Sequence, residues 1–281
     1  MTRAALISVV LPTHDGERWL RESLDSIVLQ DYRPLEVVVV DDGSTDASGA
    51  VAAEFAAAHS SLRVITLSPN RGLPSALNAG FAECRGEYLT WTSDDNRYRP
   101  GALRRMAEFL DDHPEADVVY ADMMQIDEKG GAVSLWGAGP SEEIPYRNPV
   151  GACFLYRRRV QEALTGYAED LATVEDFDFW VRAASRFTLV PLHEDLYEYR
   201  VHGSSLSSQR ASGRDGLMVT ALRRALPTMP RRLRARSHAQ LALLLRRRGE
   251  RREARRHLLA ALGLAPIASI LREARVRLHR V

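Results

Sequence analysis

The prediction of the fold starts from residues 88–100, Tyr88-Leu-Thr-Trp-Thr-Ser-Asp-Asp-Asn-Arg-Tyr-Arg-Pro100. Residues 88–92 have the composition of a buried strand, and two carboxylates and an amide follow at once, Asp94, Asp95 and Asn96. Since a strand end is rigid, we expect these groups to be held in a cleft. Adjacent carboxylates favour a hard divalent cation such as Mg²⁺ or Mn²⁺, which takes its remaining ligands from phosphates and water. A turn leading into a helix is the alternative, because Asp and Asn also favour turns and helix caps.

Apolar strands and amphipathic helices alternate on both sides of this stretch. The sequence predicts strands at 6–11, 36–40, 62–67, 88–92 and 117–121, and helices at 19–28, 47–58, 73–84 and 102–110. Such alternation is typical of an α/β fold with a doubly wound, mostly parallel sheet and helices on both faces. In these sheets ligands bind at the carboxyl ends of the strands, where Thr13, Asp42 and Asp94 all lie. We therefore expect these three residues to meet in one site.

The length of 281 residues suits one large domain with an appended segment, and the charge is divided between the two. Residues 221–281 contain 17 arginines and three acids, a surplus of 14 positive charges in a chain of net charge +1, so residues 1–220 are acidic. No run of eighteen apolar residues and no signal-peptide pattern is present, and Cys84 and Cys153 lack metal-like spacing. We expect free thiols and a cytoplasmic protein.

The basic tail is predicted to be helical from about Asp215, as a helix pair with breaks at Gly249 and Pro266. Its helices are rich in Arg and Leu, a composition that favours the surface of an anionic membrane, here the inner face, or a protein partner. A cover over the acidic body, nonspecific binding of nucleic acid and a plain solvated face remain alternatives. No aromatic residues lie among the arginines, so the tail offers no platform for specific nucleic-acid binding.

The middle of the chain contains a second group of acids. A strand pair is expected around the turn at 128–131, and residues 148–158 are typical of a glycine-containing bend that enters a strand. Thr173 is predicted to cap a helix whose first turn carries Glu175 and Asp176. Because acids at a helix start are stabilised by the helix dipole, a structural role for this acidic pair stays open at this point.

Several short motifs recur together in one known family. They are Val9-Val-Leu-Pro-Thr-His14, Val40-Asp-Asp-Gly-Ser-Thr-Asp46, Asn70-Arg-Gly-Leu-Pro-Ser-Ala-Leu-Asn-Ala-Gly80, Gly86-Glu-Tyr-Leu, Ser93-Asp-Asp-Asn, Glu175-Asp-Phe-Asp-Phe-Trp180 and Tyr199-Arg-Val-His202. In this order and spacing, residues 5–205 resemble the family-2 glycosyltransferases of the GT-A fold. The resemblance implies a 1–214 glycosyltransferase domain, with a nucleotide-sugar half at 1–100 and an acceptor half at 101–214. A basic helical extension follows at 215–281.

The resemblance also implies roles for individual residues. Asp176 would be the general base that deprotonates the acceptor hydroxyl, with Glu175 and Asp178 as lesser candidates. Asp95 and His202 would hold Mn²⁺ or Mg²⁺. The donor would be bound by Pro12, Thr13, His14, Asp42, Arg71 and Asp94, with Arg71 reaching a phosphate and Asp94 lying by the ribose or the sugar. Asp46 is better explained as a helix cap. Ser93 replaces the Asp that is commonest in the family, a departure that bears on the affinity for the metal.

The expected activity is therefore that of an inverting, metal-dependent hexosyltransferase. It would transfer a sugar from a UDP- or dTDP-sugar donor to a hydroxyl acceptor, which is a saccharide, a lipid-linked molecule or a small molecule. The expected setting is the biosynthesis of a polysaccharide, of the cell wall, of a glycolipid or of a glycoconjugate. The alternative is a non-catalytic protein of the same fold that acts as an interaction scaffold through its basic tail.

Overall fold

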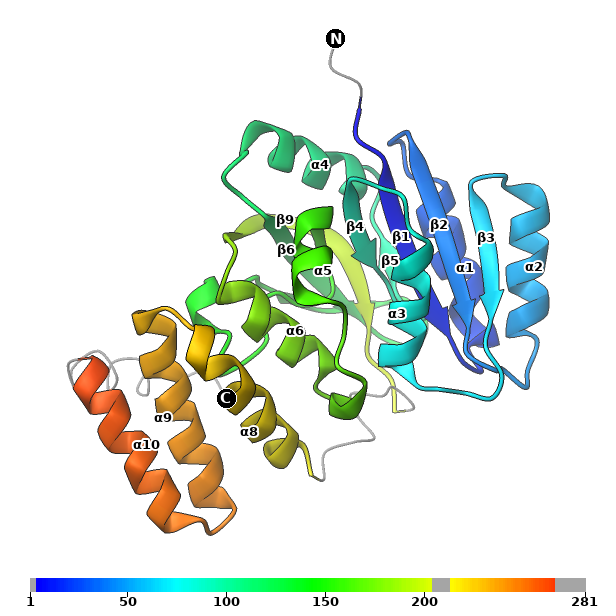
Figure 1. Ribbon diagram of the computed structural model, residues 1–281. Coiled ribbons are helices and arrows are strands. Elements are labelled where there is room, and N and C mark those ends of the chain that lie inside the picture. The colour runs from blue at the N-terminus through cyan, green and yellow to red at the C-terminus, as the bar shows by residue number, and fades with distance from the viewer. Residues whose placement is uncertain (1–3, 204–212, 266–281) are drawn as a thin grey trace.

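The computed structural model describes residues 4–203 and 213–265, and within them one nine-stranded sheet forms the centre of the molecule (Figure 1). The strands are β1 (Ile7–Thr13), β2 (Leu35–Asp41), β3 (Leu62–Thr66), β4 (Tyr88–Trp91), β5 (Arg97–Tyr98), β6 (Val118–Ile126), β7 (Ala132–Trp136), β8 (Phe154–Arg157) and β9 (Leu189–Arg200). Their order is β3-β2-β1-β4-β8-β6-β9-β5, with β7 paired to β6. The predicted α/β class is confirmed.

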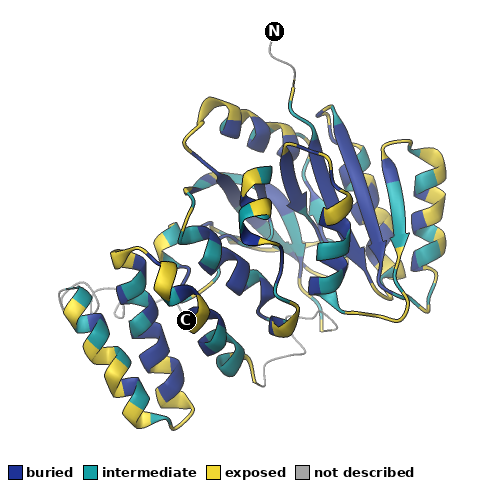
Figure 2. Ribbon diagram, in the orientation of Figure 1, coloured by how far each residue is buried: buried dark blue, intermediate teal, exposed yellow. Residues whose placement is uncertain are grey.

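The helices of the described residues either cover the two faces of this sheet or form the C-terminal extension (Figure 1). They are α1 (Glu17–Val28), α2 (Ser48–Ala58), α3 (Leu73–Glu83), α4 (Ala102–Asp112), α5 (Arg158–Leu164), α6 (Glu175–Ala184), α8 (Arg214–Ala225), α9 (Arg231–Arg247) and α10 (Arg251–Leu264), with 3₁₀ turns at Ser141–Glu143, Glu169–Leu171 and Leu226–Thr228. Side chains alternate along β1, so Val9 and Leu11 pack under α1, α2 and α4 whereas Val10 packs under α3 and α6. Figure 2 shows the resulting burial of the strands between the two helical layers.

The first four predicted strands form the parallel part of the sheet. β1 lies between β2 and β4, with Thr13 opposite Asp41 and Val10 opposite Trp91. β3 extends this part at its edge beside β2. Because parallel strands end at the same edge, the loops after β1, β2 and β4 meet there.

The second half of the sheet is mixed. β8 runs antiparallel to both β4 and β6, while the long strand β9 runs parallel to β6. The strand predicted at 117–121 continues as far as Ile126, and its hairpin with β7 confirms the expected strand pair. Strands β5 and β9 were not predicted. The sequence of β9, Leu-Val-Pro-Leu-His-Glu-Asp-Leu-Tyr-Glu-Tyr-Arg, contains neither a continuous apolar run nor a regular alternation, since the register shifts at Asp122 break its periodicity.

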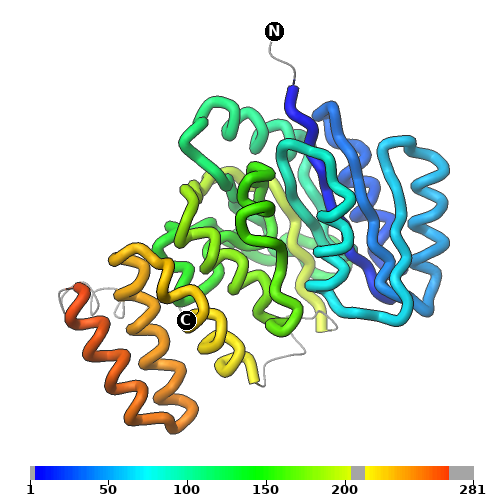
Figure 3. Tube along the Cα trace, in the orientation of Figure 1, coloured from blue at the N-terminus to red at the C-terminus, as the bar shows by residue number. Residues whose placement is uncertain are grey.

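The helical extension is confirmed through residue 265, with Gly249 between α9 and α10 in a left-handed conformation, while Pro266 lies outside the described residues. Helix α8 packs along α6, and α9 and α10 follow it (Figures 1 and 3). Val219 and Leu222 of α8 belong to the same core cluster as Trp180 of α6. The start of the extension is therefore continuous with the core of the body.

Both cysteines are buried and unpaired, as predicted. Burial raises the pKa of the Cys84 thiol to about 12, so this thiol is protonated at neutral pH. Among the described residues, no helix has the length and apolar character needed to span a lipid bilayer.

Candidate active site

A cleft of about 780 Å³ opens at the carboxyl ends of β1, β2 and β4 and extends to the first turn of α6. Eight of the nine predicted site residues line it, namely Pro12, Thr13, His14, Asp42, Asp94, Asp95, Asp176 and His202. The ninth, Arg71, lies between two lining residues, Asn70 and Gly72, and its own exposed side chain is not part of the lining. Arg214, the first residue of α8, adds a cation from the extension that the sequence did not single out.

Asp94 is held by the loop after β1. The hydroxyl of Thr13 donates to its Oδ2 at 2.6 Å. Gly16 makes this approach possible, because a Cβ at Gly16 would lie 2.0 Å from the same carboxylate oxygen. Burial raises the pKa of Asp94 to about 7; the bond from Thr13 opposes this rise, and the charge of Asp95 adds to it. The two adjacent carboxylates therefore repel each other inside the cleft.

Asp95 and His202 form the candidate metal centre. Nε2 of His202 lies 2.8 Å from Oδ2 of Asp95, and the imidazole packs against the Trp19 ring, with ring centroids 4.5 Å apart. The other oxygen of Asp95, Oδ1, is buried without a hydrogen-bond partner. A buried, unpartnered carboxylate oxygen is costly, and a cation would satisfy it. This donor set of carboxylate oxygen and imidazole nitrogen fits a divalent ion.

The protein contributes only part of such a coordination sphere. No cluster of three or more His, Cys, Asp or Glu residues suited to a metal lies within residues 4–203 and 213–265. A cation at Asp95 and His202 would therefore need further ligands besides these two residues. Mg²⁺ and Mn²⁺ sites that bind phosphate-containing substrates have this character.

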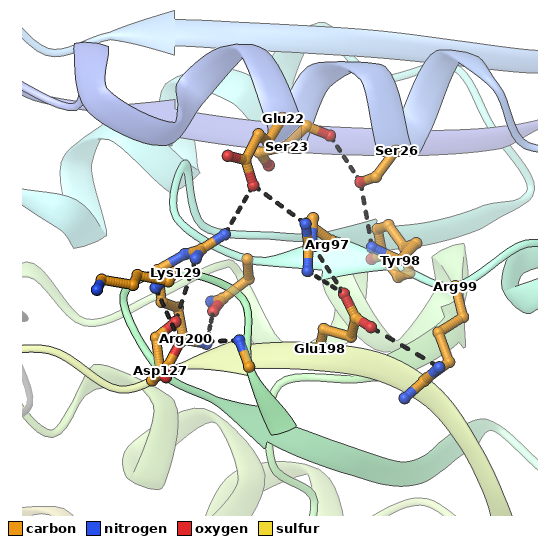
Figure 4. Close-up of polar contacts among 12 residues, drawn as sticks. Glu22, Ser23, Ser26, Arg97, Tyr98, Arg99, Asp127, Lys129, Glu198 and Arg200 are labelled. Atoms are coloured by element: carbon orange, nitrogen blue, oxygen red, sulfur yellow. Dashed lines mark hydrogen bonds and ion pairs between the residues drawn. The ribbon is translucent and has the colours of Figure 1, made fainter. Parts of the chain in front are cut away.

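Arg200 holds the backbone around Asp95 and is 1% exposed. Its Nε donates to the carbonyl of Asp95 at 2.9 Å, and its Nη1 donates to the carbonyls of Asp127 and Glu128. Its Nη2 donates to Glu22 of α1 at 2.8 Å, and Figure 4 shows the guanidinium lying between that carboxylate and Asp127. The loop of residues 93–96 carries the candidate metal ligand Asp95 and is called the metal loop below. The buried guanidinium of Arg200 thus joins this loop, the β6–β7 hairpin and α1.

The neighbouring Asn96 completes this support. Its Oδ1 accepts the backbone N–H of Arg200 at 2.7 Å, and its side chain is 1% exposed. Asn96 therefore orients the loop from inside, while Asp94 and Asp95 face the cleft.

Asp42 has a structural task in the same region. Its two oxygens accept the backbone N–H groups of Arg71 and Gly72 at 2.8 and 2.7 Å, so it fixes the loop after β3 against the end of β2. Asp41 accepts the N–H of Ser44, as expected for a turn residue. Each carboxylate oxygen has two lone pairs, so Asp42 keeps the capacity to accept one more hydrogen bond from a ligand.

The loops after β1 and β2 cap each other's helices. Asp46 accepts the N–H groups of Ser48 and Glu17, and Glu17 in turn accepts the N–H of Ala47. Burial by itself would raise the pKa of Asp46, but the hydrogen bonds that its carboxylate accepts outweigh this effect and lower the pKa. Asp46 thus accepts N–H groups at the starts of both helices, although the N-cap position of α2 itself is Ala47.

Asp176 lies at the far end of the cleft from β1, in the first turn of α6. Its Oδ2 accepts a hydrogen bond from Nδ2 of Asn148 at 3.0 Å, and Oδ1 accepts the N–H of Phe177. Oδ1 of Asn148 is itself held by the N–H groups of Val150 and Gly151. This chain of bonds fixes the direction of the carboxylate.

The neighbouring acids have other surroundings. Asp178 is 1% exposed and paired with Arg182 at 2.7 Å, and burial raises its pKa. Glu175 also lines the cleft and accepts the N–H of Thr173. The prediction that Thr173 caps α6 was wrong. The N-cap position is Val174, and Thr173 has φ 87°, so its side chain does not reach the helix end.

Sequence reasoning missed the wall beside Asp176. The Trp136 ring at the end of β7 packs over Gly151, where a Cβ would lie 2.7 Å from the ring. Gly151 has φ 68°, a conformation that favours glycine. A glycine directly after the Asn148-Pro-Val segment was the available signal, but its partner Trp136 is distant in the sequence. Together they give the cleft an aromatic side next to the carboxylate.

The geometry agrees with a comparison of the whole chain with known proteins. Residues 8–165 match the family model described as Glycosyl transferase family 2. The chain belongs to this family. This glycosyltransferase is 31% identical over 211 residues to the putative glycosyltransferase EpsE of Bacillus subtilis, with 71% of this chain and 74% of that protein covered.

Other relatives differ in length. An uncharacterized glycosyltransferase of Rickettsia typhi is 27% identical over 220 residues, and the alignment covers 74% of this chain and 67% of that protein. An uncharacterized glycosyltransferase of Rickettsia conorii is 28% identical over the same length, but this chain spans only 35% of it.

Solved structures share the fold. S. aureus TarS 1-349 in complex with UDP-GlcNAc superposes with a TM-score of 0.68 at 21% identity, over 92% of this chain and 81% of that chain. The mannosyltransferase PcManGT from Pyrobaculum calidifontis, in complex with GDP-Man and Mn²⁺, gives a TM-score of 0.66 at 20% identity, over 99% and 82% of the two chains. At this identity the likeness concerns the architecture, including the helical layers around the sheet.

Proposed function

We propose that this glycosyltransferase is an inverting, divalent-metal-dependent enzyme that uses a UDP- or dTDP-sugar donor and a hydroxyl acceptor. The observation that carries the proposal is the arrangement of one cleft. The unpartnered oxygen of Asp95 beside His202 lies at one side, and the oriented carboxylate of Asp176 lies at the other. Donor complexes of the structural neighbours, with UDP-GlcNAc and with GDP-Man and Mn²⁺, support a nucleotide sugar and a cation at the first side.

The donor side would bind the nucleotide through the loops after β1 and β2. Thr13 and His14 border the space beside Asp42, whose remaining lone pairs suit the N3–H of a pyrimidine dione. Pro12 stiffens the strand end that carries them. The diphosphate would face Asp95 and His202, and a divalent cation held there would neutralise the charge that develops on the leaving diphosphate. Arg18 and Arg214 are the arginines of the cleft lining, and Arg71 lies beside it, between the lining residues Asn70 and Gly72.

Asp176 would act as the general base. As the acceptor oxygen attacks the anomeric carbon, its proton passes to the Asp176 carboxylate, and the bond between that carbon and the diphosphate oxygen breaks. Attack from the face opposite the leaving group inverts the anomeric configuration. Asn148 keeps the base directed at the acceptor, because its amide holds one carboxylate oxygen.

Trp136 supports a saccharide-like acceptor, since its ring borders the space in front of Asp176. An acceptor in polysaccharide, cell-wall, glycolipid or glycoconjugate biosynthesis would fit this side. We place the reaction in the cytoplasm because the proposed donor, a nucleotide sugar, is a cytoplasmic molecule. We place it at the inner face of the membrane because the chain carries a basic extension. A scaffold without activity does not explain why Asp95, His202 and Asp176 line the same cleft.

The first test is thermal denaturation with UDP-, dTDP- and GDP-sugars, with and without Mn²⁺. A donor that binds the folded state raises the melting temperature by mass action, and Mn²⁺ should be required for most of the rise. Without a cation, the phosphates would face Asp94 and Asp95 across a short distance, which costs on the order of 1 kcal/mol or more. The Asp95→Ala variant should lose the effect of Mn²⁺. Equal shifts with and without the ion would remove the metal from the proposal.

The second test is the Asp176→Asn variant, which keeps the size and hydrogen-bonding capacity of the side chain. Donor binding should stay unchanged, while sugar transfer should fall by at least about a hundredfold, the usual contribution of a positioned general base. Slow hydrolysis of the donor is a usable readout before the acceptor is known. Full transfer activity in a folded Asp176→Asn protein would shift the assignment to Glu175 or Asp178.

A further inference from the structure

The outer face of α10 combines exposed arginines with exposed leucines. Its exposed residues follow one another around the helix, at about 100° per residue, over roughly 160° of the circumference. Apart from Gly263, which has no side chain, they are Leu258, Arg251, Arg255, Leu259, Arg252 and Arg256. The leucines are 45% and 59% exposed. We call these six residues the α10 face.

The α10 face carries four positive charges without compensation. Among the described residues, none of its arginines forms an ion pair. The two acids nearest in sequence are engaged elsewhere, since Glu250 pairs with Arg248 and Glu253 with Arg223. The neighbouring residues 266–281 have a similar composition, with four arginines and one acid. The field at this face is therefore positive, in contrast to the acidic body.

The orientation of α10 leaves this face open. Ala254 and Ala261 lie on the opposite side and are buried, and α10 packs against α9. In Figure 2 the exposed residues of α10 lie along the outer edge of the helical extension. Helix α9 in turn is anchored to α8 and through it to α6, so the face is presented by a rigid support.

We propose that the α10 face binds the surface of an anionic lipid membrane, with the arginines at the phosphate headgroups and Leu258 and Leu259 inserted between them. Arginine neutralises lipid phosphate, and each such residue near an anionic surface adds about fivefold to the affinity. Transfer of the two leucine side chains from water to the boundary between the headgroups and the acyl chains has a favourable free energy. Packing within residues 4–203 and 213–265 explains neither their exposure nor the unpaired arginines.

A lipid surface fits this face better than the alternatives do. Single-stranded nucleic acid is held by aromatic side chains as well as by charge, and the α10 face contains none. The phosphates of a duplex would engage the arginines but would leave Leu258 and Leu259 in water. A protein partner would need shape and a pattern of hydrogen-bond acceptors, whereas a convex helix with two kinds of side chain suits a fluid, uniformly charged surface. The face also lies outside the cleft, since no residue of α10 lines it. Membrane binding is thus separable from donor binding.

The test is sedimentation of the full-length protein with vesicles of phosphatidylcholine, with and without phosphatidylglycerol. Binding should require the anionic lipid and should weaken between about 0.1 M and about 1 M salt, because the Debye length falls from about 10 Å to about 3 Å. The first variant removes three charges of the face, by Arg252→Gln, Arg255→Gln and Arg256→Gln. Its affinity for the anionic vesicles should be about a hundredfold lower than that of the wild type. Its matched control removes three exposed arginines of the body, by Arg21→Gln, Arg85→Gln and Arg104→Gln, and should bind like the wild type.

A second variant separates insertion from charge. Leu258→Ser with Leu259→Ser keeps all four arginines, and it should bind several-fold more weakly even at low salt. Unchanged binding of this variant would overturn the insertion, and equal losses in the body control would overturn the assignment to the α10 face. Wild-type protein that ignores anionic vesicles but binds a single-stranded oligonucleotide through the same arginines would overturn the lipid assignment. In all variants, the melting temperature and the shift caused by the donor should stay as in the wild type.

Discussion

At the residue scale, the geometry of the proposed donor end of the cleft depends on single contacts between atoms. Gly16 has an ordinary negative φ, so its importance is steric rather than conformational. The carboxylate of Asp94 occupies the space that a side chain at this position would need. The same contact allows Thr13 to reach Asp94 and so links the first strand end to the metal loop.

We expect Gly16→Ala to push Asp94 away and to break its bond with Thr13. Metal-dependent donor binding should weaken by about tenfold or more, roughly the value of one charge-assisted hydrogen bond. The matched control is Gly263→Ala in α10, where an added Cβ meets nothing within 4 Å. Titration calorimetry of the donor with Mn²⁺ checks both variants. An unaltered affinity in the Gly16 variant would show that Asp94 does not contribute to the donor site.

At the proposed acceptor end, we expect Asn148 to act as a positioning residue for Asp176. The Asn148→Asp change keeps an oxygen for the N–H groups of Val150 and Gly151 but replaces the amide donor by a second carboxylate about 3 Å from Asp176. Like charges so close raise the pKa of the base. We expect the acidic limb of the turnover–pH profile to move to higher pH, with donor affinity unchanged. A profile identical to that of the wild type would exclude the positioning role.

At the scale of elements, long strands and buried charges bring distant loops together. Strand β9 ends in Arg200, which bonds to carbonyls of two loops and to α1, and then delivers His202 to Asp95 two residues later. Figure 4 shows that Arg97 and Glu198 continue this network beside Arg200. A buried arginine with satisfied donors stabilises one arrangement of these loops rather than several.

The pairing of α9 with α10 contains two histidines, His238 and His257, whose Nδ1 atoms lie 2.8 Å apart. Burial lowers the pKa of both below the usual 6.5; the positive charges of His257 and Arg234 add to the effect on His238, and for His257 Glu253 opposes it. Two uncharged rings can share one proton between them, whereas two charged rings repel.

The sign of the pH effect follows from these lowered pKa values. As the pH falls below about 6.5, the unfolded chain binds protons that the folded chain does not, so stability is lost on acidification. We expect the melting temperature to fall between pH 7.5 and pH 5.5, and to fall less in a His257→Gln variant. Equal falls in both proteins would mean that this pair does not contribute. Circular dichroism of the full-length chain is sufficient as a readout.

At the scale of the whole molecule, the extension and the body share one core. Leu222 of α8 is 0% exposed within the cluster that also contains Trp180, and Arg214 at the start of the same helix lines the cleft. The boundary predicted at 214/215 therefore divides the chain by charge and by sequence motif. It does not divide the hydrophobic core.

We expect Leu222→Ala to destabilise the entire protein by about 2–5 kcal/mol, the usual cost of a cavity at a buried leucine. The control Leu243→Ala lies in α9 at 47% exposure and should change stability by no more than about 0.5 kcal/mol. Urea denaturation followed by tryptophan fluorescence measures both. If Leu222→Ala left the stability of the body unaltered, α8 would be a separate unit.

The sequence by itself determined the layout of the first half of the molecule. The apolar runs that end in Thr13, Asp42 and Asp94 predicted parallel strands whose carboxyl ends meet, because the strand period and the turn residues are local properties. The separation of acidic body from basic tail was also readable, since charge is counted without knowing the fold. So was the gathering of the predicted residues, all but Arg71, around one cleft.

The contacts between loops that line the cleft became known only from the tertiary structure. The bond from Asn148 to Asp176, the space at Gly16, the Trp136 ring over Gly151 and the anchoring of the metal loop by Arg200 all join residues far apart in the chain. The period of a strand or helix contains no information about which loops face each other. That is set by packing of whole layers, in which β9 lies beside β6 and α8 along α6. The unpaired α10 face likewise became definable only once its opposite side was seen to be buried.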